Sequence, residues 1–458
     1  MNILEKQIPT LDSSEECRDV PAEVPLKVSV IDGMAELQSL SKPPEITTCS
    51  QLADHFSDQL FQKFADSDEI HLVFDRYDVQ QSLKSATREK RQGDQDPVHY
   101  KITDSTHIGK VQMKRLLSHS TTKMELTEYL ARKTLEHAET TGKQFVVAWS
   151  CQCQATHKNV QHLESTQEEA DTKMLLHAVD SARQGATAID ICSPDTDVLI
   201  LSLRRYQDLC RNTNFVTGTG QRHRVIKLRS IVETLGMEKV AALPALHALS
   251  GCDNTGSFFG KGKLSWWKAF QVADEETITT LSDLGTSNTL SPNTIATLEK
   301  FICQLYVPKT SVKSVKELRW LLFRKKQAQA EKLPPTQAAL IETLKRANYQ
   351  AIVWRNDVVP IPQLPSPQNF GWSLEENEWI PVMTTELPAP SAVIHLVKCG
   401  CVKDRCSTNR CQCQKARLRC TDLCGCADFD DACENSFNEE SFTEEDGDDD
   451  YDSDDSDH

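Results

Sequence analysis

The sequence predicts an α/β fold in which helices flank a parallel sheet. Short apolar segments with the length and branched content of buried strands alternate with longer segments that carry apolar residues at helical spacing. The strand-like segments are 27–33, 70–75, 145–149, 188–192 and 198–203, and the helical ones include 48–65, 98–140 and 168–178. Because ligands of such folds bind beyond the carboxyl ends of the strands, residues just after the strands are the first candidates for a functional site.

Length and composition allow several domains and show no membrane segment. The 458 residues suffice for two or three domains. We find neither a run of eighteen apolar residues nor an apolar segment behind a basic N-terminus, so we expect no transmembrane helix and no secretory signal. Eight of the 17 cysteines are scattered over the first 303 residues, and nine fall between Cys399 and Cys433. We expect the scattered ones to be reduced thiols and the clustered ones to be metal ligands.

Shifts in composition divide the chain into six predicted segments. They are a disordered N-terminus (1–24), an α/β domain (25–272), a helical extension (273–346), a Pro- and Trp-rich connector (347–395), a cysteine module (396–435) and an acidic disordered tail (436–458). The tail holds twelve Asp or Glu residues and no Lys or Arg, so the formal net charge of −16 becomes −4 without it. The rest of the protein is therefore nearly balanced in charge.

Acidic residues follow the predicted strands. The first strand reaches Asp32, and Gly33 permits a sharp exit from it. The second strand ends on Asp75, and the pair Glu169 and Asp171 opens the helix after the third. A parallel sheet would bring these side chains to one edge. Each alone is more often a helix cap or a loop residue, but the ordered set is hard to explain by capping.

Asp195 and Asp197 lie between the apolar segments 188–192 and 198–203. If the chain is extended at this point, the two carboxylates point the same way. Neighbouring carboxylates repel each other unless a cation lies between them, which favours a divalent metal. An Asx-type turn that caps the next element is the alternative.

A glycine-rich segment further along adds an acid and two cations. Asp253 follows Gly251, and the turn Gly260-Lys261-Gly262-Lys263 comes soon after. Glycines let backbone N–H groups approach a phosphate oxygen, and the two lysines supply positive charge. An ordinary glycine loop between helices is the alternative.

From about residue 27 to 270, these motifs resemble in order the PIN-like nuclease fold of the flap-endonuclease superfamily. In that family an acid ends the first strand, as Asp32 does, and a second acid follows in a hydrophobic-Phe-Asp motif, as Asp75 does. The motif that opens a helix matches Glu169-Ala170-Asp171, with Asp in place of the family's second Glu, and an Asp-x-Asp turn matches Asp195-Thr196-Asp197. Gly251-Cys252-Asp253 and the Gly260–Lys263 turn match a helix–turn–helix element.

The resemblance implies a metal-dependent nuclease that acts on DNA. Two Mg²⁺ or Mn²⁺ ions would activate a water molecule and stabilise the leaving oxygen at a phosphodiester. The acids that would hold them and carry catalysis are Asp32, Asp75, Glu169, Asp171, Asp195, Asp197 and Asp253. Nucleic-acid contacts are expected from Lys84, Arg88 and Arg91 near the scissile phosphate, and from Gly260, Lys261, Gly262 and Lys263. The region 98–140 corresponds in place to the family's arch over the substrate but matches none of its motifs.

Nine clustered cysteines form the most specific pattern in the chain. They are Cys399, Cys401, Cys406, Cys411, Cys413, Cys420, Cys424, Cys426 and Cys433. A segment of about forty residues with few apolar side chains cannot build a core, so metal must hold it. Because tetrahedral zinc takes four ligands, nine thiolates satisfy two ions with one thiolate left over, or three ions if three thiolates bridge. The Cys-x-Cys pairs favour three bridged Zn²⁺ ions.

The cysteine spacing resembles one repeat of a tesmin-type CXC domain, a zinc-binding and often DNA-binding family that usually carries two repeats. Between Lys398 and Cys420 there are seven Lys or Arg residues and one acid, and we expect Lys415 and Arg417 to face phosphates. The acidic tail either competes with nucleic acid for this surface or keeps the protein soluble. The combination of modules resembles animal proteins associated with transposons.

Two functions are therefore compatible with the sequence. In the first, the protein is a divalent-metal-dependent nuclease whose zinc module assists nucleic-acid binding. In the second, it is a non-catalytic DNA-binding or scaffold protein with a degenerate nuclease fold. The complete set of acids favours the first. For both we expect DNA as the partner, no membrane, and a nuclear location, with the cytoplasm as the alternative.

Overall fold

A computed structural model describes the chain as two compact units. The first comprises Met1–Gly256, Asp274–Leu290 and Lys345–Pro381, and the second comprises Ser257–Ala273, Ser291–Leu344 and Val382–His458. The residues described are 2–6, 26–79, 81–84, 98–324, 332–384, 399–401, 406–408, 410–415, 420, 424–426 and 433–435. None of the helices among them is long and apolar enough to cross a membrane.

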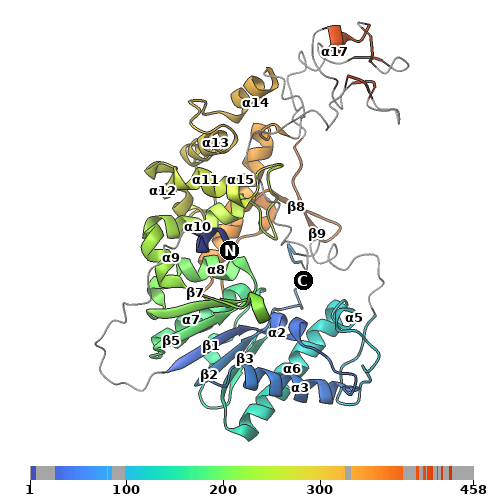
Figure 1. Cartoon of the computed structure of the whole chain (residues 1–458), viewed down its shortest axis with the longest axis vertical. Helices are drawn as coiled ribbons and strands as arrows, with labels where there is room; N and C mark the ends of the chain where they lie inside the picture. The colour runs from blue at the N-terminus through green and yellow to red at the C-terminus, as the bar shows by residue number, and fades with distance from the viewer. Residues whose placement is uncertain are drawn as a thin grey trace. The chain divides into compact units, whose positions relative to one another are not determined.

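A seven-stranded sheet forms the centre of the first unit (Figure 1). Its strands are β1 (Lys27–Asp32), β2 (Glu69–Val73), β3 (Gln144–Trp149), β4 (Gln152–Ala155), β5 (Ala188–Cys192), β6 (Asn212–Thr217) and β7 (Arg224–Lys227). The order is β4-β3-β2-β1-β5-β6-β7; the five central strands are parallel, and the two edge strands pair antiparallel. The predicted parallel α/β sheet is thus confirmed, with two antiparallel edges that the sequence did not reveal.

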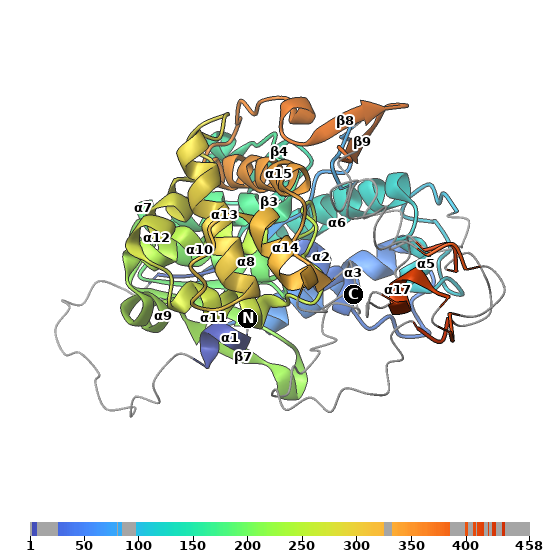
Figure 2. The same ribbon diagram turned by 90° about the horizontal axis from the view of Figure 1, so that it is seen from above.

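Helices cover both faces of this sheet, which explains why nearly all residues of the strands β1, β2 and β3 are buried. On one face, α3 (Cys49–Lys63) and α6 (Ser120–Thr141) enclose a large core that includes Phe56, Leu130 and Phe145. On the other face, α7 (Ala170–Arg183) packs against β1, β2 and β5. Figure 2 shows the same elements from above. The α3 helix begins with a capping box between Thr48 and Gln51, as its sequence suggests.

Further helices complete the first unit. They are α1 (Asn2–Glu5), α2 (Gly33–Ser39), α5 (Met113–Leu116), α8 (Thr196–Arg204), α9 (Leu228–Leu235), α10 (Met237–Leu249) and α12 (Glu275–Asp283). Single 3₁₀ turns lie at Gln161–Leu163, Tyr206–Asp208, Gly220–Arg222 and Pro367–Asn369. The region 98–140 is helical only from Met113 onward, because the residues from 98 to 112 form turns and irregular chain.

The prediction of a strand at 198–203 is wrong, because these residues belong to the helix α8. All six of them are buried, so this helix has no polar face to give it a helical period. A short apolar run that is buried all round cannot be told from a buried strand by periodicity.

The predicted connector at 347–395 contains regular structure in its described part. The helix α15 (Gln337–Arg355) extends into it, and the strands β8 (Trp372–Glu375) and β9 (Glu378–Pro381) form a hairpin. Trp372 and Trp379 are buried in a small core together with Tyr349, Ile352 and Phe370. The buried tryptophan side chains therefore hold this segment in a defined structure, although its many prolines predicted an extended connector.

The second unit contains α11 (Lys263–Gln271), α13 (Pro292–Tyr306), α14 (Val315–Arg324) and, in the cysteine module, the single turn α17 (Gln412–Lys415). Trp266 of α11 is buried against Phe258 and against Phe301 of α13. The predicted helical extension, 273–346, contains α12, α13, α14 and the first part of α15 in its described residues.

Candidate active site

Asp32 occupies the carboxyl end of the central strand β1. Its Oδ1 accepts hydrogen bonds from the backbone N–H groups of Met34 and Ala35, both at 3.0 Å, so it also caps α2. The backbone after Asp32 runs so close to β2 that a Cβ atom at Gly33 would lie 2.5 Å from Cε1 of Phe74. Gly33 has an ordinary φ angle, so its role is this close approach rather than the sharp exit that we expected.

Asp75 lies two residues beyond the end of β2, beside the start of α7. Its Oδ1 accepts a hydrogen bond from the backbone N–H of Ala170 at 2.7 Å, and the Tyr77 hydroxyl donates to its Oδ2 at 3.0 Å. The N–H of Arg76 donates to the carbonyl of Glu168 at 2.7 Å. These bonds attach the end of β2 to the first turn of α7, and therefore place Asp75 near Glu169 and Asp171.

Asp195 and Asp197 begin the helix α8 beyond the end of β5. Asp195 is the N-cap residue, and its Oδ1 accepts from the N–H of Asp197 at 2.8 Å, so the capping turn that we considered as the alternative is present. The Ser193 hydroxyl donates to Asp32 Oδ2 at 3.3 Å and accepts from the N–H of Asp195 at 3.1 Å. Capping does not exclude a role in metal binding, because only one oxygen of Asp195 is used in this bond.

Glu169 and Asp171 project from the start of α7. Glu169 is the N-cap residue, but its side chain makes no capping bond; its Oε2 instead lies 3.0 Å from Nζ of Lys84. The same ammonium group lies 3.0 Å from Oδ2 of Asp253. Asp171 is only 7% exposed, but its carboxylate oxygens are not among the buried side-chain atoms of the described residues that lack a partner.

The electrostatics indicate that these carboxylates crowd one another. Burial, together with the charge of Asp75, raises the pKa of Asp32 to about 6. Burial and neighbouring carboxylates raise the pKa values of Glu169 and Asp195 to about 7 despite the opposing charge of Lys84. The pKa of Asp171 is raised well above its ordinary value, first by burial and then by the charge of Asp195. Without a further cation, the cluster cannot hold its full negative charge near neutral pH.

Hard divalent cations fit this donor set. Carboxylate oxygens are the ligands that Mg²⁺ and Mn²⁺ prefer. A cation beside Asp171 would relieve the repulsion from the neighbouring carboxylates, which together with burial raises the pKa of this residue well above its ordinary value. The residues that could hold such ions are the seven predicted acids. Six of them come from the ends of the strands and the starts of α7 and α8, and Asp253 joins them from the loop after α10 through its contact with Lys84.

Two residues at this edge were missed in the sequence. His247 of α10 places Nε2 2.7 Å from Oδ1 of Asp197. Lys173 of α7 is 1% exposed, and its Nζ donates to the carbonyl oxygen of Ser150 at 2.8 Å and to that of Phe74 at 3.4 Å. Burial lowers the pKa of Lys173 to about 8, although the charge of Asp75 opposes the shift. A polar residue inside an apolar helical run was the only available signal for either.

The residues that we expected to contact nucleic acid do not lie together in the structure. Lys84 lies among the carboxylates, whereas Arg88 and Arg91 fall outside the described residues. Gly260, Lys261, Gly262 and Lys263 belong to the second unit and lead into α11, for which Gly262 is the N-cap residue. Gly260 has a φ of +66°, which glycine adopts without strain.

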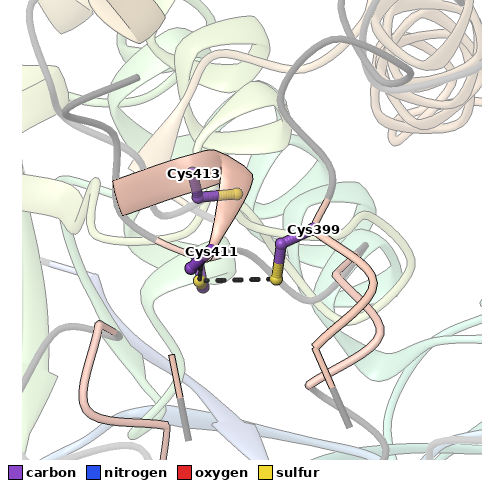
Figure 3. Close-up of side chains that lie close together, drawn as sticks. Cys399, Cys411 and Cys413 are labelled. Carbon is purple, nitrogen blue, oxygen red and sulfur yellow. Dashed lines mark hydrogen bonds between the residues drawn. The ribbon is translucent and has the colours of Figure 1, made fainter. Parts of the chain in front are cut away.

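The nine predicted cysteine ligands pack into one cluster, in which all except Cys401 and Cys433 are buried. Cys411 and Cys413 flank the start of α17, and the sulfur of Cys399 faces that of Cys411 (Figure 3). Three groups of four cysteines have all their sulfur atoms within 4.8 Å of one another, and Cys399 belongs to all three. The backbone supports this arrangement, because the N–H of Gly425 donates to the carbonyl of Cys399 at 2.8 Å.

The sulfur–sulfur distances fit tetrahedral zinc. Cys399 Sγ lies 3.7 Å from Cys406, 3.8 Å from Cys420 and 3.7 Å from Cys426. A Zn–S bond of about 2.3 Å in a tetrahedron gives a sulfur–sulfur separation of about 3.8 Å, whereas a disulfide requires about 2.05 Å. The described cysteines are all free thiols. Lys415 is exposed on α17, and Arg417 lies outside the described residues.

No protein-family model matches this chain, and no curated protein does either. Among solved structures, it is similar to two crystal structures of a phage protein. One is the bacteriophage T5 protein co-crystallised with metal ions, at 13% identity and a TM-score of 0.38, with 72% of this chain and 91% of the phage chain covered. The other is a variant of the T5 flap endonuclease in a complex with DNA and metal ions, at 14% identity and a TM-score of 0.34, with 72% and 99% covered.

Proposed function

We propose that this protein is a divalent-metal-dependent nuclease that cleaves phosphodiester bonds in DNA. The observation that carries the proposal is the cluster of carboxylates around Lys84 at the carboxyl edge of the sheet, in which burial and neighbouring carboxylates raise the pKa values of Glu169, Asp171 and Asp195. Such perturbed acids at the carboxyl edge of a parallel sheet are typical of a metal-binding active site.

The ions would be held by the seven acids. Backbone N–H groups donate to one carboxylate oxygen of each of Asp32, Asp75 and Asp195. The hydroxyls of Ser193 and Tyr77 donate to the second oxygens of Asp32 and Asp75, so these carboxylates are held in fixed orientations. His247 orients Asp197 in the same way. A pair of Mg²⁺ or Mn²⁺ ions, when bound, would lower the pKa of a water molecule and stabilise the charge that develops on the leaving oxygen.

The cysteine module, residues 396–435, would bind three Zn²⁺ ions through its nine thiolates, three of them bridging. With Lys415 and Arg417 it would assist nucleic-acid binding, as a single repeat of the CXC type. Arg88, Arg91 and the Gly260–Lys263 turn would add contacts to phosphates. A protein with these partners is expected in the nucleus.

The second candidate is a DNA-binding or scaffold protein without catalysis. Lys84 favours it, because its ammonium group already bonds to two of the carboxylates, Glu169 and Asp253. A lysine that already compensates part of the negative charge, together with protons on the remaining acids, would let the sheet edge be stable without a metal. In that case the acids would be structural, and the cysteine module would account for nucleic-acid binding.

Cleavage assays with purified full-length protein separate these candidates. Labelled flap, hairpin, single-stranded and duplex DNA, with RNA counterparts, would be incubated with Mg²⁺, Mn²⁺ or EDTA. The nuclease proposal expects cleavage of at least one DNA substrate with Mg²⁺ or Mn²⁺ and none with EDTA. Binding in a mobility shift without cleavage under any of these conditions would favour the second candidate.

A further inference from the structure

Lys84 is built into the carboxylate cluster rather than exposed beside it. Its side chain is 15% exposed, and its Nζ lies 3.0 Å from Glu169 Oε2 and 3.0 Å from Asp253 Oδ2. These two acids come from the start of α7 and from the loop after α10, which are far apart in sequence. One ammonium group therefore joins two parts of the cluster.

The charge of Lys84 is held there by several acids at once. Burial alone would lower the pKa of its ammonium group, but nearby carboxylates raise that pKa well above its ordinary value. In decreasing order of effect, these carboxylates belong to Glu169, Asp171, Asp253 and Asp75. All four are among the acids that would bind the divalent ions. The ammonium group of Lys84 thus lies among the carboxylates that would hold a metal ion, and it has the same sign of charge.

The backbone before Lys84 is anchored, so its side chain alone can move away. The Ser82 hydroxyl donates to Glu168 Oε1 at 2.5 Å and accepts from the N–H of Lys84 at 3.0 Å. Leu83 packs against the small core around Trp372, and the Gln81 side chain donates to Asn377 at 2.7 Å. An anchored backbone with a long, flexible lysine side chain allows the ammonium group to leave without a change of fold.

We propose that Lys84 is a resident counter-ion of the metal-free site, which divalent cations must displace in order to bind. This inference rests on the proposed function, because it assumes that the same carboxylates bind Mg²⁺ or Mn²⁺. Displacement exchanges two carboxylate–ammonium contacts for carboxylate–metal contacts and releases a positive charge at the edge of the site. The released ammonium group is then available to a phosphate of the nucleic acid, so metal loading and substrate binding support each other.

The first test is Mn²⁺ binding by isothermal titration calorimetry, on zinc-loaded full-length protein. Lys84→Met removes the competitor, so it should bind Mn²⁺ about tenfold more tightly than the wild type, which corresponds to about one pKa unit of interaction. Lys84→Arg keeps the charge and should bind Mn²⁺ no more tightly than the wild type. Lys63→Met is the matched control, because Lys63 pairs with Glu36 at 2.6 Å outside the cluster. Equal Mn²⁺ affinity of Lys84→Met and wild type would overturn the inference.

A second measurement needs no variant, in case Lys84→Met fails to fold. Acetylation of lysines in the wild-type protein, read by peptide mass spectrometry, should reach Lys84 faster when Mn²⁺ is present, because its ammonium group has left the carboxylates. An unchanged acetylation rate at Lys84, with Mn²⁺ bound, would contradict displacement. If the wild type binds no Mn²⁺ at this site, the proposed function fails as well. If Mn²⁺ binds and displaces Lys84 but no substrate is cut, only the nuclease proposal fails.

Discussion

At the scale of single residues, a methyl group at position 33 would disturb the carboxylate cluster. A Cβ atom there would lie 2.5 Å from the ring of Phe74, which is fully buried and precedes Asp75. We therefore expect Gly33→Ala to lower the free energy of unfolding by about 1–3 kcal/mol, the usual cost of overpacking, and to weaken Mn²⁺ binding. Urea denaturation and calorimetry measure the two effects. Gly256→Ala is the control, because its Cβ would meet no atom within 4 Å. A Gly33→Ala protein as stable as the control would show that the ring yields easily.

Cys399 is the residue on which the cysteine module depends most. It belongs to all three four-cysteine groups, whereas Cys433 belongs to none of them. Native mass spectrometry of reduced full-length protein should find three zinc ions in the wild type, and Cys399→Ser should lose more zinc than Cys433→Ser because a bridging thiolate serves two ions. Two ions in the wild type would indicate an unbridged pair with a spare cysteine. Equal zinc loss in the two variants would contradict a central role for Cys399.

At the scale of elements, four of the five parallel strands were predictable because burial on both faces makes them largely apolar. The sequence therefore located β1, β2, β3 and β5 and the acids that follow them. It could not separate the buried helix α8 from a strand, and it missed the parallel strand β6, which begins with Asn-Thr-Asn, and the short edge strands β4 and β7. Sequence spacing also does not show which side chains meet across elements, so it missed the contact between His247 and Asp197.

Sequence patterns also did not reveal the buried polar contact between β2 and α7. His71 of β2 is fully buried, and its Nδ1 lies 2.9 Å from Nδ1 of His177 in α7. A histidine within an apolar run has no periodic pattern that would reveal its partner. The sequence likewise predicts only a nucleic-acid contact for Lys84. Its bonds to Glu169 and Asp253 join three segments that are distant in sequence, so no local pattern reveals them.

The carboxylate cluster predicts how the stability of the protein depends on pH. The pKa of Asp32 is raised to about 6 and those of Glu169 and Asp195 to about 7, so these groups hold protons in the folded state that the unfolded state has lost. Their contribution to stability is therefore largest below about pH 4 and falls as pH rises to about 7. Mg²⁺ should then raise the melting temperature more at about pH 7.5 than at about pH 5.5, where protons compete with it. Scanning fluorimetry with Mg²⁺ or EDTA tests this; an equal rise at both pH values would exclude these groups as the ligands.

At the scale of the whole molecule, charge is divided between a nearly balanced body and the acidic tail. Deletion of Ser436–His458 removes twelve negative charges. We expect it to tighten DNA binding and to steepen the dependence of affinity on salt, because the basic surface of the cysteine module no longer has an internal competitor. Fluorescence anisotropy over a range of salt concentrations measures both quantities. A neutral Gly/Ser tail of the same length is the control, and unchanged binding would make the tail a solubility device.

The central claim is that the acids at the sheet edge bind the metal that cleaves DNA. Its most direct test is cleavage with Mg²⁺ or Mn²⁺ by the double variant Asp195→Asn and Asp197→Asn. Asparagine still caps α8 and still accepts a hydrogen bond from His247, so the fold and the zinc content should persist while two metal-binding charges are lost. The control, Asp54→Asn with Asp58→Asn, removes two exposed carboxylates of α3 outside the cluster. We expect full cleavage by the control and none by the cluster variant, whereas cleavage at the wild-type rate by the cluster variant would contradict the account.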